Sequence, residues 1–166
     1  LQALHKEKKL KLIHDISPEL EQTVLGDPFR IRQIVTNLIG NAFKFTEEGH
    51  IKVTGNADVG KGTIMTARIE VSDTGIGIAK EKQHLIFKEF TQADSTTEKK
   101  FGGYGLGLTI SKKLTELLKG NLTLESKPKQ GSTFTLQLPL QISTKSVVKN
   151  SESAYLIPKL RLLIID

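Results

Sequence analysis

The chain has 166 residues, of which 37% are hydrophobic and 25% are charged, and it contains no cysteine. A chain of this length is expected to fold as one domain with a full core, and without cysteine it forms neither a disulfide nor a thiolate metal site. The formal net charge of +6 could suit nucleic acid, but the lysines are scattered and several alternate with glutamate, so we expect solvated surfaces and no nucleic-acid partner.

The first part of the chain predicts a strand and a long helix. Residues 1–9 are typical of the end of a helix whose start is missing, and the alternation of apolar and polar residues in 10–16 predicts a strand. Asp27 and Pro28 predict the start of a long helix, with Asp27 as N-cap and Pro28 at the first helical position. Apolar residues at helical spacing predict one buried stripe along this helix: Ile31, Ile34, Leu38, Ala42 and Phe45.

The middle of the chain predicts two antiparallel strands and then a less regular segment. Residues 50–56 and 63–72 have the strand pattern and are joined by a turn rich in glycine and aspartate. Residues 80–101 have no clean period, so we expect short helical turns and a mobile loop there.

The last part of the chain predicts a helix, a hairpin and a linker. Residues 106–121 are helical in pattern, and Gly120 is a typical signal for the end of a helix. Residues 121–140 alternate in steps of two and predict a hairpin. Residues 141–158 are rich in serine, threonine and lysine and predict a linker, while 159–166 are typical of the opening strand of a further domain.

Three polar side chains on the long helix suggest a nucleotide site. Asn37, Asn41 and Lys44 follow one another at helical spacing and therefore point the same way, beside the apolar stripe. An asparagine oxygen is a hard neutral ligand suited to Mg²⁺, and lysine is a natural counter-charge for phosphate. On this helix alone, an ordinary exposed polar stripe explains the pattern equally well.

A carboxylate stands at the end of the second predicted strand, in the segment "DTGIGI". Asp73 is followed by Gly75 and Gly77, so a hydrogen-bond acceptor lies beside unobstructed backbone. Such a carboxylate can accept a hydrogen bond from the exocyclic amine of adenine. The alternative is a common Asp-Thr-Gly turn without a ligand.

Closely spaced glycines lie just before and at the start of the last predicted helix: Gly103, Gly105 and Gly107. No Gly-Lys-Ser/Thr follows them, which excludes a P-loop, and Leu108 stands where the Rossmann fingerprint has its third glycine. Bare backbone before a helix N-terminus can cradle phosphates, and Lys99 and Lys100 just upstream could supply cations. A flexible surface loop is the alternative.

Taken together and in this order, the segments resemble the ATP-binding catalytic domain of sensor histidine kinases, in the superfamily shared with DNA gyrase, Hsp90 and MutL. "RQIVTNLIGNAFKFT" resembles the asparagine box and "DTGIGI" the first glycine box. "IFKEFTQADSTTEKKFGGYGLGLTI" resembles the phenylalanine box, the ATP lid and the second glycine box, and "GSTFTLQLP" is similar to the closing strand. The implied fold is an α/β (α+β) two-layer sandwich with a mixed, mainly antiparallel sheet covered on one face by helices.

The resemblance also implies roles for individual residues. Asn41 would bind Mg²⁺, Asn37 and Lys44 would contact phosphate, Phe45 would lie near the adenine, and Asp73 would accept a hydrogen bond from the adenine amine. Thr133 would join the adenine-side hydrogen-bond network, Phe87 and Phe90 would anchor the base of the lid, and the catalytic set would be Asn37, Lys44, Lys99 and Lys100. The remaining implied ATP contacts are Gly75, Gly77, Ile78, Phe90, Gly103, Tyr104, Gly105, Leu106, Gly107 and Leu108. For Phe45, Phe87 and Phe90, core packing is an equally good explanation.

One position favours phosphoryl transfer over hydrolysis. In the hydrolysing members of the superfamily, a glutamate that activates water stands one turn before the metal-binding asparagine, whereas this chain has Asn37 there. A neutral amide cannot act as that general base, so we expect a kinase. A gyrase/Hsp90/MutL-type ATPase and a nucleotide-binding module without transfer are the alternatives.

The phosphorylated group is expected to lie outside the chain. None of His5, His14, His50 and His84 has the acceptor pattern of the family, so the acceptor histidine should lie upstream of residue 1. The resemblance therefore implies four parts: the end of a dimerisation helix (1–9), the ATP-binding catalytic domain (10–140), a linker (141–158) and the start of a receiver domain with its phosphorylated aspartate (159–166). We expect a cytoplasmic domain of a bacterial inner-membrane sensor that is a homodimer.

Overall fold

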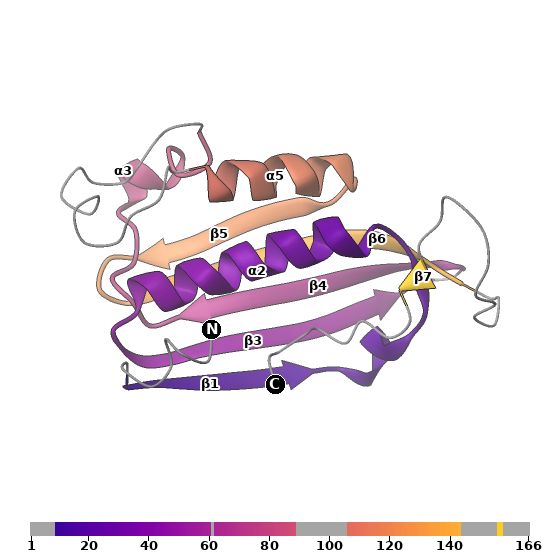
Figure 1. Cartoon of the computed structure of the whole chain (residues 1–166), viewed down its shortest axis with the longest axis horizontal. Coiled ribbons are helices and arrows are strands. Elements are labelled where there is room, and N and C mark those ends of the chain that lie inside the picture. The colour runs from indigo at the N-terminus through magenta and orange to yellow at the C-terminus, as the bar shows by residue number, and fades with distance from the viewer. Residues whose placement is uncertain (1–8, 61, 89–105, 144–155, 158–166) are drawn as a thin grey trace.

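A mixed sheet forms one layer of the molecule and two longer helices form the other (Figure 1). The computed structural model describes residues 9–60, 62–88, 106–143 and 156–157. In chain order its elements are β1 (Lys9–Ile16), the 3-10 helix η1 (Pro18–Glu21), β2 (Val24–Leu25), α2 (Pro28–Phe45), β3 (Glu48–Val59), β4 (Ile64–Asp73), α3 (Lys80–Gln83), α5 (Gly107–Leu117), β5 (Asn121–Lys127), β6 (Gly131–Ile142) and β7 (Leu156–Ile157).

The sheet has the order β1-β3-β4-β6-β2-β7, and β5 also pairs with β6. Strands β1 and β3 are parallel, and the other pairings within the described residues are antiparallel. The predicted mixed, mainly antiparallel sheet is therefore confirmed. Strand β7 comes from the stretch predicted as a linker and pairs with β2, so that part of the chain returns to the sheet edge.

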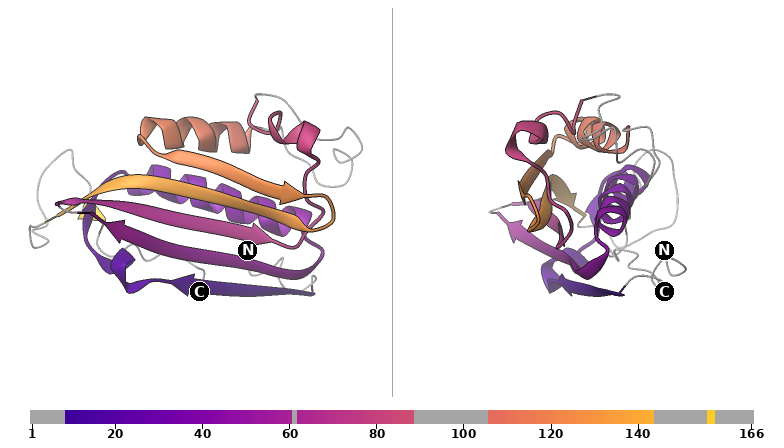
Figure 2. Two further views of the ribbon diagram at one scale, coloured as in Figure 1. Left: turned by 180° about the vertical axis from the view of Figure 1, so that it is seen from behind. Right: turned by 90° about the vertical axis from the view of Figure 1, so that its left-hand side faces the viewer.

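The two faces of the sheet differ because side chains alternate along each strand. On β4 one face is buried, with Met65, Ala67, Ile69 and Val71 each only 1% exposed. An end-on view shows α2 and α5 on the same side of the sheet (Figure 2, right). The predicted arrangement, with helices covering one face, is confirmed.

The predicted start of the long helix is confirmed by α2. The Asp27 carboxylate accepts hydrogen bonds from the backbone nitrogens of Phe29 and Arg30, each 3.1 Å from Oδ1. These two bonds satisfy N–H groups that a helix leaves free at its start. The helix begins with Pro28 and ends at Phe45.

The apolar stripe of α2 differs from the prediction at its C-terminal end. Its first four predicted members are buried, but Phe45 is partly exposed and Phe43 is buried instead, at 5% exposure. Val35 and Ile39 are also buried, so the stripe is wider than a single row along the helix. A wide stripe suits a helix that lies across several strands.

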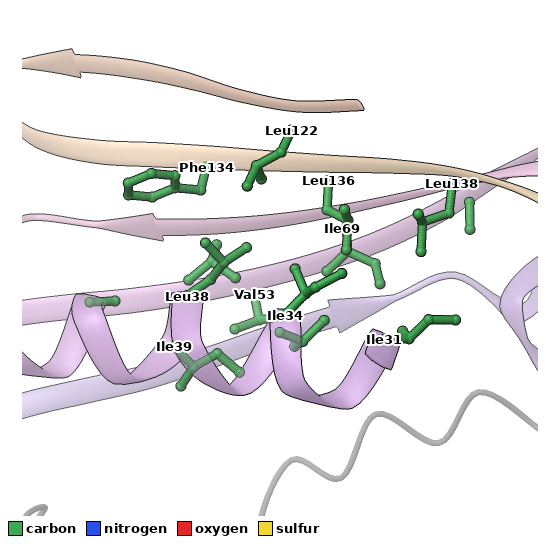
Figure 3. Close-up of a cluster of buried hydrophobic side chains, with 14 of the residues drawn as sticks. Ile31, Ile34, Leu38, Ile39, Val53, Ile69, Leu122, Phe134, Leu136 and Leu138 are labelled. Carbon is green, nitrogen blue, oxygen red and sulfur yellow. The ribbon is translucent and has the colours of Figure 1, made fainter. Parts of the chain in front are cut away.

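The core fills the space between α2 and the sheet (Figure 3). Ile34 and Leu38 of α2 are fully buried and point toward Ile69 of β4 and Leu136 of β6. The ring of Phe87 packs edge-on against Phe134, with centroids 6.5 Å apart, so Phe87 belongs to this core. Core packing alone is enough to explain Phe87.

The C-terminal end of α5 corrects the prediction for Gly120. The residue with left-handed backbone is Lys119, with φ of 58°, and Gly120 has no positive φ. The backbone nitrogens of Lys119 and Gly120 donate to the carbonyls of Glu116 and Thr115, both at 2.9 Å, which is a Schellman ending with lysine at the position usually held by glycine. Gly120 serves close packing instead, because a Cβ there would lie 2.6 Å from Leu138 Cδ2.

The less regular segment begins as predicted, with a short α3 followed by turns up to residue 88. No helix within the described residues is long and apolar enough to cross a membrane.

Candidate functional site

The polar side chains predicted on the long helix lie together on one side of α2. Asn37, Asn41 and Lys44 are each partly exposed, whereas their apolar neighbours Leu38 and Ala42 are buried. The helix therefore has a core side and a polar side, as its spacing predicts. The C-terminal end of α2, the end of β4 and the start of α5 gather at the same end of the molecule (Figure 1).

Asp73 is the last residue of β4, and its side chain is directed to the helix-covered face of the sheet. It is 8% exposed, and its Oδ1 accepts a hydrogen bond from the backbone nitrogen of Gly75 at 2.8 Å. Burial raises the pKa of Asp73, while hydrogen bonds from the backbone of Gly75 and Ser132 and from the Thr46 hydroxyl lower it in part. A buried carboxylate is costly without donors, so a further donor from a ligand would be favourable here.

The loop after β4 passes close to the end of α2, and Gly75 makes this possible. A Cβ on Gly75 would collide with the carbonyl oxygen of Phe45 and lie 2.9 Å from Asp73 Oδ1. The next residue, Ile76, donates its backbone N–H to the Phe45 carbonyl at 3.2 Å. The loop at Gly75 therefore connects Asp73, the predicted acceptor for adenine, to α2, which carries the predicted phosphate contacts.

Gly77 allows the same loop to contact the turn between β5 and β6. It has φ of +65°, and a Cβ would collide with the carbonyl oxygen of Lys127. The carbonyl of Ile76 accepts a hydrogen bond from Lys129 at 2.7 Å. The resemblance implies that both glycines contact ATP; the structure shows that they make room for the protein chain, and their contact with the nucleotide remains a prediction.

Thr133 requires a correction, because the structure places its side chain on the face opposite Asp73. Thr133 pairs with Ser72, and their hydroxyls lie 2.9 Å apart. Asp73 pairs instead with Ser132, which is 7% exposed. Successive residues of a strand alternate between faces, so Ser132 is on the side of Asp73 and Thr133 is not.

Ser132 is a site residue that the sequence analysis missed. Its hydroxyl lies 3.0 Å from Ser126 Oγ, which accepts a hydrogen bond from the backbone nitrogen of Ile78 at 2.8 Å and donates to the Gly131 carbonyl at 2.9 Å. This network holds Ile78 beside the first residues of β6. Counting in steps of two from the buried Phe134 would have identified Ser132.

The opposite face of the sheet carries a separate polar cluster. The guanidinium of Arg68, as a hydrogen-bond donor, holds the pKa of Glu70 below its usual value, and the hydroxyls of Thr54 and Thr135 contribute to this effect. Arg68 and Glu70 are both partly exposed to solvent. Because the cluster is on the far side of the sheet from Asp73, it does not belong to the candidate site.

The start of α5 lies directly against Asn37. A Cβ on Gly107 would collide with Asn37 Oδ1, and Asn37 Nδ2 donates to Ser111 Oγ at 2.9 Å. Leu108 is partly buried and packs against the core, which accounts for it without a ligand, and Leu106 occupies the N-cap position of the helix without a side-chain capping hydrogen bond. The remaining predicted residues of this segment lie outside the described residues: Phe90, Lys99, Lys100, Gly103, Tyr104 and Gly105.

The predicted phosphate and adenine contacts at the end of α2 touch each other. The Lys44 ammonium lies 5.0 Å from the centroid of the Phe45 ring, within the range of a cation–π contact. Both side chains are partly exposed, so a ligand can reach them.

The donor set can accommodate magnesium only together with phosphate. The described residues contain no group of three or more histidine, cysteine, aspartate or glutamate side chains that could hold a metal. Asn41 offers one partly exposed amide oxygen, and Mg²⁺ commonly takes its other ligands from water and substrate phosphates. The residues present therefore fit a magnesium ion that arrives with a nucleotide.

Comparison with known proteins identifies relatives of this chain. The model of the family described as "Histidine kinase-, DNA gyrase B-, and HSP90-like ATPase" matches residues 26–142. The signal transduction histidine-protein kinase BarA of Escherichia coli K12 is 36% identical over 153 residues, which are 92% of this chain and 17% of BarA. The sensor protein TorS of the same organism is 40% identical over 161 residues, which are 97% of this chain and 17% of TorS.

The fold has solved relatives as well. The structure of full-length ShkA in complex with AMPPNP is similar over 85% of this chain and 28% of ShkA, with 33% identity and a TM-score of 0.70. The chain thus spans less than a third of the length of BarA, TorS and ShkA.

Proposed function

Because this chain belongs to the family of histidine kinase-, DNA gyrase B- and HSP90-like ATPases, we propose that it is the ATP-binding catalytic domain of a sensor histidine kinase. It binds Mg²⁺·ATP and presents the γ-phosphate to a histidine outside residues 1–166. The names of BarA and TorS, which match nearly the whole chain, support this choice within the family.

The observation that carries the proposal is the buried carboxylate of Asp73 next to the polar side of α2. Gly75 holds one carboxylate oxygen, and the loop that follows is bound to the Phe45 carbonyl at the end of α2. The exocyclic amine of adenine would add the further donor that a buried carboxylate favours.

The phosphates extend from this end of α2 toward its middle. Asn37 precedes Phe45 by eight residues, and a helix rises about 1.5 Å per residue, so the polar side is about 12 Å long here. This length suits an elongated ligand with a base at one end and charges at the other. Lys44 supplies positive charge, and Asn41 supplies an amide oxygen to the magnesium that neutralises the phosphates.

Transfer rather than hydrolysis follows from Asn37. A carboxylate at this position would remove a proton from an attacking water, but an amide cannot, and Asn37 is also engaged by Ser111. The remaining contribution of the chain is to position the γ-phosphate and stabilise its charge, which is most of what phosphoryl transfer requires. The competing ATPase function predicts steady hydrolysis by the chain alone, whereas we expect slow hydrolysis.

The partners of the reaction lie in other parts of the parent protein. We propose an acceptor histidine in a dimerisation domain before this chain and a receiver-domain aspartate after it, in a hybrid kinase that passes phosphate from histidine to aspartate. The parent would be a membrane-attached homodimer with this domain in the cytoplasm.

Replacement of the proposed magnesium ligand tests the assignment. Asn41→Asp places a negative charge beside the phosphates, so Mg²⁺·AMPPNP binding, measured by calorimetry, should weaken by tenfold or more, about 1.4 kcal/mol. Asn56→Asp makes the same change at an exposed position of β3 and should leave binding unchanged. Unchanged binding by Asn41→Asp would show that Asn41 does not hold the metal.

A further inference from the structure

A buried serine of α5 binds the asparagine that faces the proposed phosphate site. Ser111 is 1% exposed, and its Oγ accepts a hydrogen bond from Asn37 Nδ2 at 2.9 Å, between residues 74 positions apart in the sequence. On the other side of the same amide, Gly107 approaches Asn37 Oδ1 so closely that no Cβ would fit. The Asn37 side chain is therefore held between two residues of α5.

The buried residues of α5 are polar, unlike those of α2. The buried residues of α5 as a whole are Thr109, Ser111 and Thr115, all of which carry hydroxyls, and Ser111 and Thr115, four residues apart, share one face of the helix. Buried hydroxyls are unfavourable unless they make hydrogen bonds. Thr115 donates to the Ser111 carbonyl at 2.7 Å within the helix, and Thr109 Oγ1 is buried without a hydrogen-bond partner, whereas Ser111 is the buried hydroxyl of α5 that bonds to α2 in the described residues.

We propose that Ser111 is a positioning residue for the nucleotide, acting through Asn37. This inference rests on the proposed function, because Asn37 matters only if phosphates bind beside it. An asparagine side chain loses rotational freedom when it binds a ligand, and a side chain that is already fixed loses less. Ser111 and Gly107 fix the Asn37 amide before nucleotide binds, so affinity for the phosphates is higher than a free side chain would allow.

The same contact joins the two helices at the site. Asn37 lies in the middle of α2 and Ser111 in the second turn of α5, so a shift of α5 along α2 would break the hydrogen bond. The orientation of Asn37 therefore depends on the position of the helix that begins with Gly107.

A double-mutant cycle tests whether Ser111 acts through Asn37. The affinity for Mg²⁺·AMPPNP is measured by calorimetry for the full chain and for Ser111→Ala, Asn37→Ala and the double variant. The matched control is Thr115→Val, which removes a buried hydroxyl of the same helix that does not touch Asn37. Adenosine binding, followed by NMR, reports on the Asp73 end of the site alone.

We expect Ser111→Ala to weaken Mg²⁺·AMPPNP binding about five-fold, with no further loss when Asn37 is already alanine. Thr115→Val should keep wild-type affinity, and adenosine binding should be the same in all variants. If Ser111→Ala binds as tightly as wild type, or if its loss is equally large in the Asn37→Ala background, the role of Ser111 is overturned.

Failure of the proposed function would look different, because the wild-type chain itself would then not bind Mg²⁺·AMPPNP. NMR coupling constants of the Asn37 side chain give a readout without nucleotide. Wild type should show a single rotamer about the Cα–Cβ bond, and Ser111→Ala should show averaging. A single rotamer in both proteins would contradict the positioning role.

Discussion

The Asp73 carboxylate, at the end of β4, accepts a hydrogen bond from the backbone nitrogen of Gly75, 2.8 Å from Oδ1. This short contact shapes the loop that then binds the end of α2 through the Phe45 carbonyl. One acidic side chain thus links the sheet to the helix that carries Asn41. The same side chain is the proposed acceptor for adenine, so structure and binding can be tested at one position.

Asp73→Asn should weaken Mg²⁺·AMPPNP binding about 10-fold to 100-fold, because a hydrogen bond to a charged group contributes about 1.5–3 kcal/mol. The new amide can still accept the hydrogen bond from Gly75, so circular dichroism should show an unchanged fold. Asp58→Asn, at an exposed position of β3, removes the same charge away from the site. Calorimetric titration of the three proteins compares them, and equal affinities would exclude Asp73 as an adenine contact.

The raised pKa of Asp73 predicts how stability depends on pH. The folded state binds the proton of the Asp73 carboxyl more tightly than the unfolded chain does. The stability that this proton contributes is therefore fully present below the ordinary pKa of 3.8 and is lost as pH rises through the raised pKa. The free energy of unfolding of wild type relative to Asp73→Asn should therefore fall over this range, as urea denaturation at several pH values would show. A difference that rises with pH would mean that the pKa of Asp73 is lowered, not raised.

Neighbouring hydroxyls on β6 should behave differently because they lie on opposite faces of the sheet. Ser132→Ala removes a hydroxyl beside Asp73. If this hydroxyl hydrogen-bonds the nucleotide, its loss should weaken nucleotide binding several-fold. Thr133→Val removes a hydroxyl that bonds to Ser72 on the far face and should leave affinity unchanged. The reverse result in calorimetry would restore Thr133 to the site and exclude Ser132.

The close contact at Gly77 should make substitution costly. Gly77→Ala requires a positive φ for alanine and a shift of the Lys127 carbonyl, so it should lower the free energy of unfolding by about 2–4 kcal/mol. Gly40→Ala is the matched control, since nothing lies within 4 Å of a Cβ there and alanine favours a helix interior. It should raise the free energy of unfolding by about 0.5–1 kcal/mol. Urea denaturation distinguishes the two, and a neutral Gly77→Ala would show that the loop is not held against the β5–β6 turn.

The end of α5 offers a pair of changes with opposite effects. Lys119→Gly should stabilise the protein by about 0.5–1 kcal/mol, because glycine adopts a φ of 58° without strain. Gly120→Ala should destabilise it by about 1–3 kcal/mol, because a Cβ would crowd Leu138. If the two melting temperatures shifted the other way, Gly120 would be the true helix-ending residue.

Local signals in the sequence were enough to predict α2 and the alternation of the strands. Asp27 and Pro28 determine the start of the helix through hydrogen bonds within a few residues, and apolar spacing alone identifies most of its buried side. Similarly, the period of two along β4 separates its buried and polar faces.

Contacts between distant segments account for what the sequence analysis missed. Glycine is required at position 77 because the chain passes close to the Lys127 carbonyl, and Asn37 forms its hydrogen bond with Ser111. In both cases the two residues are far apart in the sequence. The face of the sheet on which Thr133 lies follows from its pairing with Ser72. Because Phe134 is apolar and adjacent, alternation along the strand was the one local signal that Thr133 faces away from the core. Such relationships depend on strand register and helix packing, which local spacing does not encode.

In the proposed complex, Mg²⁺·ATP binds between the polar side of α2 and the loop after β4. An ¹⁵N-resolved NMR titration of the whole chain with Mg²⁺·AMPPNP tests it residue by residue. We expect saturable shifts at Asn37, Asn41 and Lys44 and along residues 73–78, with little change at Ser72 and Thr133. Shifts confined to the far face of the sheet, or none at millimolar nucleotide, would contradict it.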